Sequence, residues 1–149
     1  MAVNTDFEGR EYPPGPPYVV GREAIREFAL AVGATSPLHH EVGAAREAGY
    51  ADVIAPPTFA VRLAQRCEQQ YVADPAAGID FSRVVHAEER FEHARPLVAG
   101  EEVVASLRVE RVRVVGGNGM VTTRVELAVA GETAAVVTST LLVRAEEAA

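Results

Sequence analysis

The chain has 149 residues, 48% of them hydrophobic and 23% charged, an ordinary composition for a soluble globular protein that predicts a single domain over residues 1–149. Its 14 basic and 21 acidic residues give a net charge of −7, which argues against nucleic-acid binding because phosphate recognition needs clustered Lys and Arg. No apolar run approaches the roughly 20 residues that span a bilayer, and the N-terminus lacks the basic and apolar regions of a secretion signal.

The first third of the chain predicts an extended arm, a short strand and two helices. Residues 1–17 hold four of the nine prolines and therefore form an arm, which leads into a strand at residues 18–20. A helix begins at Arg22, because apolar residues recur at the helical spacing i, i+3, i+4 and i+7: Ile25, Phe28, Ala29 and Val32. Gly33 ends this helix, and a short second helix follows at residues 44–48.

A long helix is predicted at residues 57–71, since Pro57 suits a first helical turn. One side of this helix is apolar, while its polar residues, Glu68 among them, fall mostly elsewhere; the apolar side comprises Ala60, Leu63, Ala64, Cys67 and Tyr71. The single cysteine of the chain therefore belongs to the core, excludes an internal disulfide and suits a cytoplasmic protein.

The remainder of the chain reads as strands, at residues 83–95, 103–114, 121–129 and 133–144. The glycine-rich residues 116–119 predict a hairpin, and a flip in the polar–apolar alternation near Arg111 predicts a β-bulge. One long helix followed by antiparallel strands indicates an α+β fold.

The loop after the first helix resembles the Gly-Asp-x-Asn-Pro-(Ile/Leu)-His motif of the MaoC-like hydratases and dehydratases. Four positions match this motif: Gly33, Pro37, Leu38 and His39. Ala34 stands where that family has its catalytic Asp, and Ser36 stands where it has Asn. Members of the family hydrate enoyl thioesters or dehydrate 3-hydroxyacyl thioesters, so the resemblance implies a dehydratase scaffold that lacks one of its two proton-transfer groups.

The resemblance continues through residues 54–60, 84–100 and 138–143. It implies the hot-dog fold, in which a curved antiparallel sheet wraps around a long central helix. The chain is most similar to the subunits of mycobacterial-type (3R)-hydroxyacyl-ACP dehydratases that lack the Asp/His pair. Such subunits associate with a separate catalytic subunit and help to enclose the acyl chain.

Four candidate site residues follow from the motif and from the start of the long helix. His39 is either a remaining general base, worth ~10²–10⁴-fold in rate, or a structural remnant. Pro57, Thr58 and Phe59 lie where unpaired backbone N–H groups can bind a thioester oxygen, or they only cap and pack the helix. Glu41 is a poor substitute acid, since it lies beyond His39 and would need an unusual loop path.

The other histidines predict no metal site. His39 and His40 are adjacent, and His86 and His93 are expected on opposite faces of a strand, so neither pair converges on one ion. His86 is either a wall of the acyl pocket or dimer seam, or a solvated residue. The charges at residues 88–92 are expected to form a solvated sheet face.

Together these features predict a substrate-binding, largely non-catalytic subunit of a 3-hydroxyacyl-thioester dehydratase that needs no cofactor. Its ligand would be an acyl-CoA or acyl-carrier-protein thioester, and its partner a MaoC-like catalytic subunit that carries Asp and His. Two alternatives stay open: a homo-oligomeric acyl-thioester-binding protein without turnover, and a self-sufficient hydratase or thioesterase that uses His39.

Overall fold

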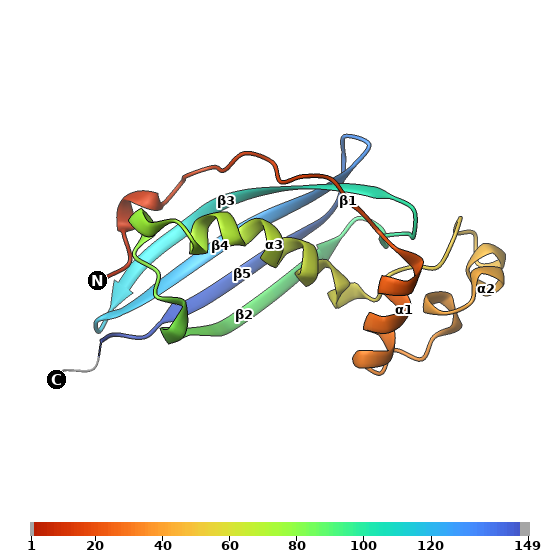
Figure 1. Cartoon of the computed structure of the whole chain (residues 1–149), viewed down its shortest axis with the longest axis horizontal. Coiled ribbons are helices and arrows are strands. Elements are labelled where there is room, and N and C mark those ends of the chain that lie inside the picture. The colour runs from red at the N-terminus through yellow and green to blue at the C-terminus, as the bar shows by residue number, and fades with distance from the viewer. Residues whose placement is uncertain (1, 147–149) are drawn as a thin grey trace.

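A computed structural model describes residues 2–146 and shows an antiparallel five-stranded sheet with one long helix across one face (Figure 1). The strands are β1 (Tyr18–Val19), β2 (Val84–His93), β3 (Glu102–Val115), β4 (Asn118–Val129) and β5 (Glu132–Val143), in the spatial order β1-β3-β4-β5-β2. The predicted α+β class, with a sheet curved around a helix, is confirmed. The single domain predicted over residues 1–149 includes residues 1 and 147–149, which lie outside the described part.

Turn chemistry sets the register of the long strands. Gly116 and Gly117 both have positive φ, 57° and 81°, which suits the tight hairpin that pairs Val115 with Asn118. The predicted bulge is confirmed as a register shift between Val109 and Arg111. Because this bulge restores the alternation, the buried apolar side chains of β3 lie on one face of the sheet from Val103 to Val112.

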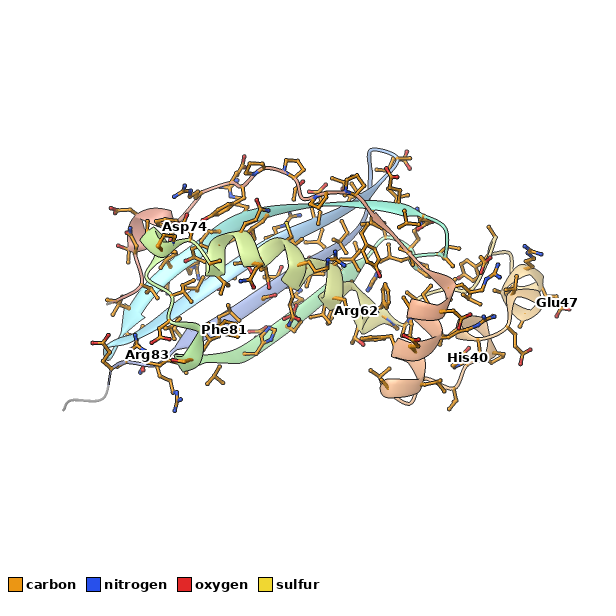
Figure 2. The ribbon with its side chains drawn as sticks, viewed as in Figure 1. His40, Glu47, Arg62, Asp74, Phe81 and Arg83 are labelled. Carbon is orange, nitrogen blue, oxygen red and sulfur yellow. The ribbon has the colours of Figure 1, made fainter. Side chains whose placement is uncertain are left out.

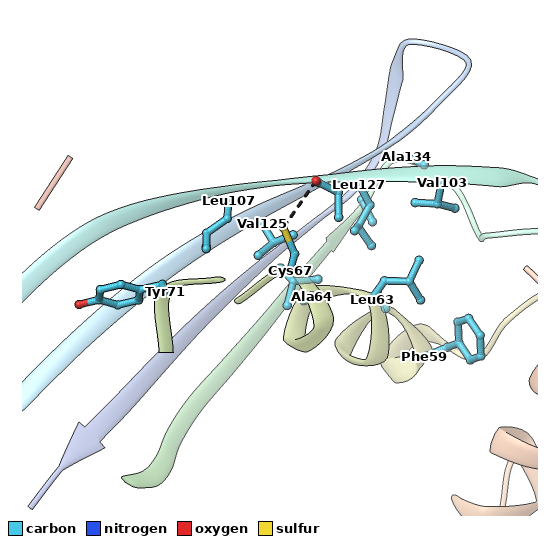
Figure 3. Packing of buried hydrophobic residues seen from close by; sticks show 14 of the residues in the cluster. Phe59, Leu63, Ala64, Cys67, Tyr71, Val103, Leu107, Val125, Leu127 and Ala134 are labelled. Carbon is cyan, nitrogen blue, oxygen red and sulfur yellow. Dashed lines mark hydrogen bonds between the residues drawn. The ribbon is translucent and has the colours of Figure 1, made fainter. Parts of the chain in front are cut away.

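The helix α3 (Ala60–Val72) follows a short 3-10 turn, η3 (Pro57–Phe59), in agreement with the predicted helix at residues 57–71. Figure 3 shows its buried side chains, among them Leu63 and Cys67, directed at the sheet. The Cys67 thiol donates to the Ala105 carbonyl oxygen at 3.5 Å, and burial raises its pKa. The expectation of a core cysteine is therefore confirmed. Within residues 2–146, no helix combines the length and the apolar character required to cross a membrane.

The proline-rich arm lies along the outer edge of β3 (Figure 1). It contains one 3-10 turn, η1 (Thr5–Phe7), and is otherwise largely extended. The N–H groups of Gly9, Tyr12 and Gly15 donate to carbonyl oxygens of β3 at 2.8–3.0 Å, and β1 then pairs with the start of the same strand. At the other side of the sheet, β2 pairs only with β5 among the described residues. The outer edge of β2 is therefore the open edge of the sheet.

The sheet has a second bulge, which lies in β2. It contradicts two expectations about the side chains of that strand. The register shifts between His86 and Glu88, so that His86 is paired with Leu141 and His93 with Ala135. Both partners are buried beneath α3, and the two histidines therefore share the helix face of the sheet instead of facing opposite sides. The extra residue inverts the alternation within the strand.

The same bulge places Glu89 on the helix face, opposite Ser139, where the glutamate side chain is only 18% exposed. The expectation that residues 88–92 form one solvated face is thus wrong for Glu89. Glu68 of α3 is also buried, at 4% exposed, although the sequence placed it among the polar residues. Its position four residues after Ala64 and eight after Ala60 was the signal for this burial.

Candidate functional site

The loop that carries the motif begins at the end of α1 (Arg22–Ala31). Gly33 adopts a φ of +70°, and its N–H donates to the Leu30 carbonyl oxygen at 3.3 Å. The Ala34 N–H reaches back to the Ala29 carbonyl oxygen at 2.8 Å. These two bonds form a Schellman motif, so the helix end itself fixes the backbone at position 34.

Further hydrogen bonds close the loop around η2 (Pro37–His39). The Ser36 hydroxyl accepts from the Leu38 N–H at 3.4 Å, and Nε2 of His40 donates to the Ala34 carbonyl oxygen at 2.8 Å. Arg26 in turn donates to the His40 carbonyl oxygen at 2.9 Å. The loop is therefore held by backbone hydrogen bonds together with the side chains of Arg26, Ser36 and His40. Figure 2 shows His40 beside α1, at the end of the molecule where α3 begins.

His39 is half-buried, and the backbone orients its ring. Its Nδ1 lies 2.7 Å from the Ile54 carbonyl oxygen, which can only accept, so Nδ1 carries the proton of the neutral ring. The Ile54 N–H donates to the Leu38 carbonyl oxygen at 3.0 Å, which ties the same two segments together. Nε2 is left as an unprotonated acceptor without a partner among the described residues. This tautomer suits a general base.

No carboxylate accompanies His39 among residues 2–146. Ala34 has no titratable group, and Glu41 is exposed at the start of α2 (Val42–Glu47), without a hydrogen bond or ion pair to His39. Among the described residues, this loop therefore offers His39 without the paired carboxylate that the family motif supplies.

The start of α3 lies next to this loop, since the chain passes from Ile54 to Pro57 in three residues. Pro57 and Thr58 are exposed, and the Pro57 carbonyl oxygen accepts a hydrogen bond from Nε2 of His93 at 2.8 Å. Phe59 is fully buried, and its ring packs edge-to-face on Phe28 at 5.4 Å. The structure thus brings Pro57 and Thr58 to the surface near His39, while Phe59 supports them from below.

His86 lies elsewhere on the sheet. It precedes His93 by seven residues on β2, a separation of at most about 23 Å at 3.3 Å per residue. There it contacts Glu89 and lines a cavity of about 280 Å³ between α3 and β2, together with Glu68, Phe81 and Leu141. The sequence-based candidates therefore form two groups, one at the motif loop and one at the far half of α3.

Two buried carboxylates distinguish the second group. The Ser139 hydroxyl donates to Glu89 at 2.9 Å, and the Thr123 hydroxyl donates to Glu68 at 2.7 Å. Burial raises the pKa of Glu89, although the bond from Ser139 and the contact with His86 oppose this shift. Within residues 2–146, no three His, Cys, Asp or Glu side chains gather in a way that could hold a metal ion.

Sequence reasoning missed His93, Glu68 and Glu89 as parts of these groups. His93 and Glu89 face the helix only because of the bulge in β2, for which the polarity of that strand gives no signal. Glu68 could have been found from its helical spacing with the two buried alanines.

Comparisons with known proteins agree with this geometry. A family model described as "FAS1-like, dehydratase domain region" matches residues 6–137. A UPF0336 protein of Clavibacter michiganensis is 52% identical over 99% of this chain and 100% of its own length. A structure of a MaoC-like dehydratase matches 93% of this chain and 42% of its own, with 31% identity and a TM-score of 0.85. A C-terminally truncated HadBC complex of Mycobacterium tuberculosis, a (3R)-hydroxyacyl-ACP dehydratase, matches 93% of this chain and 98% of its own, with 30% identity and a TM-score of 0.83.

Proposed function

Because the chain belongs to the family of MaoC-like hot-dog dehydratases, we propose that it is a substrate-binding, largely non-catalytic subunit of a (3R)-3-hydroxyacyl-thioester dehydratase or enoyl-thioester hydratase in the cytoplasm. The observation that carries the proposal is Ala34, which occupies the position of the family's acid in a loop with ordered backbone geometry.

The chemistry explains why one missing group matters. Elimination of water from a 3-hydroxyacyl thioester removes a proton from Cα and protonates the hydroxyl that leaves from Cβ. His39 offers a single acceptor at Nε2, and no carboxylate stands beside it to assist. A subunit that carries both Asp and His would perform the proton transfers, while this chain would bind and enclose part of the substrate.

The open edge of β2 supports a paired assembly. The arm protects the edge of β3, whereas the ten-residue β2 exposes its outer edge. A partner sheet that joins there would satisfy the free backbone groups and extend the sheet across the interface. A second copy of this chain could use the same edge, which keeps the homo-oligomeric thioester-binding protein as the second candidate.

The test is an assay of hydration of crotonyl and longer trans-2-enoyl thioesters by the purified chain, alone and with a MaoC-like subunit whose Asp and His are intact. We expect background rates for the isolated chain and turnover for the complex. Robust turnover by the chain alone, abolished by His39→Ala but not by Glu41→Gln, would refute the proposal in favour of a self-sufficient enzyme. Exclusive self-association, with thioester binding but no turnover, would favour the second candidate.

A further inference from the structure

Two neighbouring arginines on α3, Arg62 and Arg66, combine a lack of ion pairs, which Arg111 and Arg113 share, with stacking on aromatic rings. All 14 basic residues are arginines, and several of them are matched with carboxylates, as Arg22 is with Asp52. Arg62 and Arg66 form no ion pair with any carboxylate of the described residues. A protein with a net charge of −7 thus keeps two neighbouring cations without a counter-charge.

Aromatic rings hold both guanidinium groups in place. The central carbon of the Arg62 guanidinium lies 5.3 Å from the centre of the Phe59 ring, and that of Arg66 lies 5.1 Å from the centre of the Tyr18 ring. Stacking of this kind orients a guanidinium and leaves its N–H groups free to bind an anion. The two residues are one helical turn apart and are both exposed (Arg62 is labelled in Figure 2).

These arginines line a surface groove of about 580 Å³ together with Tyr18, Gln65 and Gln69. Each of the five side chains offers a hydrogen-bond donor, and none is a carboxylate. The acidic residue of this part of α3, Glu68, points instead toward the sheet and binds Thr123. The groove therefore offers two cations and several hydrogen-bond donors, a set that suits an anion with several acceptor oxygens.

We infer that this groove binds the phosphate of a phosphopantetheine arm, the group shared by acyl-CoA and acyl-carrier-protein thioesters. The inference rests on the proposed function, because the acyl group and the thioester are themselves uncharged. Arg62 lies three residues after the end of η3, where the thioester would lie, and Arg66 is roughly 12 Å from Thr58 along the helix axis. The pantetheine arm is a linear chain that separates thioester from phosphate, and paired arginines bind phosphate in a bidentate manner.

The experiment measures binding of coenzyme A, 4′-phosphopantetheine and pantetheine to the full chain by calorimetry. We expect both phosphate-bearing probes to bind at least tenfold more tightly than pantetheine, with an affinity that falls as salt increases. The double variant Arg62→Gln/Arg66→Gln should lose this tenfold advantage. The matched control is Arg111→Gln/Arg113→Gln, which removes two exposed arginines from the opposite face of the sheet and should bind as the wild type does.

Equal binding of pantetheine and phosphopantetheine, or an unchanged advantage in Arg62→Gln/Arg66→Gln, would overturn the inference. So would equal weakening of phosphate binding by the control substitutions Arg111→Gln/Arg113→Gln. Dehydratase activity of the two-subunit complex is measured separately. If the complex is active but Arg62→Gln/Arg66→Gln does not change phosphate binding, the inference about the groove is refuted and the proposed function is retained. If the substitutions weaken phosphate binding but no active complex forms, the groove is retained as a phosphate site and the proposed dehydratase function is refuted.

Discussion

We expect the double substitution Ala34→Asp and Ser36→Asn to give the isolated chain hydratase activity that depends on His39. The two hydrogen bonds at the end of α1 and the bond from His40 to the Ala34 carbonyl oxygen fix the backbone of this loop. Two of these bonds use backbone atoms of residue 34 and the third joins Gly33 to Leu30, so none of them depends on the side chain at position 34. Ala34 is half-buried, so an aspartate side chain has a route to solvent and does not have to enter the core.

The size of the gain follows from two opposing terms. A well-placed acid–base group contributes ~10²–10⁴-fold in rate. A misplacement of ~1 Å costs ~10²-fold, and nothing around Ala34 is built to orient a carboxylate. Together these terms allow a net gain of up to about a hundredfold, and we expect at least about tenfold over background. A carboxylate just beyond the C-terminus of α1 also opposes the helix dipole, at a cost of ~0.3–1 kcal/mol, which the fold should tolerate.

The assay follows hydration of crotonyl thioesters by the double variant and by two controls. One control replaces Ala34 with Asn, which has the shape of Asp without its charge, and the other adds His39→Ala to the double variant. Both should remain at background. If the double variant folds and binds an acyl thioester but also remains at background, then the loop has diverged from a catalytic geometry, and the idea of a vestigial active site is refuted.

Two further predictions concern the core. Leu63→Ala should lower the free energy of unfolding by about 2–3 kcal/mol in urea titrations, the lower part of the usual range, because Leu63 already borders a cavity of about 380 Å³. The exposed Gln65→Ala should change it by less than about 0.5 kcal/mol, and an equally small effect of Leu63→Ala would contradict the packing of α3. For Glu89, burial raises the folded-state pKa above the unfolded value, so its contribution to stability is present below the unfolded pKa and is lost as pH rises through the folded pKa. Glu89→Gln should therefore gain stability relative to the wild type as pH rises through that window, and a pH-independent difference would show that the carboxylate does not titrate there.

Much of the fold is encoded in local chemistry and could be predicted from the sequence. The hairpin at residues 116–119 needs two residues with positive φ, and two glycines supply them. The bulge near Arg111 is visible because β3 is buried on one face, so an extra residue shifts the apolar positions. The long helix was recognisable from a proline in its first turn and an apolar stripe.

The bulge in β2 left no such mark, because edge strands carry polar residues on both faces. Because β2 carries polar residues on both faces, its sequence fits either assignment of residues to the two faces. Only the pairing with β5 shows that His86, Glu89 and His93 face the helix. The environment of Glu89 depends on Ser139, fifty residues away in the chain, whose hydroxyl becomes its donor only through this register. Long-range register of this kind cannot be read from a single strand.

The motif loop depends on both local and long-range contacts, and its backbone geometry does not require an acid at position 34. The end of α1 is determined by residues close together in the chain and was predicted from Gly33. The His39 tautomer instead depends on Ile54, whose position beside His39 could not be predicted from the sequence. The contacts that hold the loop at residue 34 involve its N–H and C=O groups and would form with any side chain that tolerates the site. Replacement of an acid by alanine therefore removes chemistry without removing structure. In the proposed assembly, this separation would let the chain keep a thioester-binding surface while a partner supplies the proton transfers.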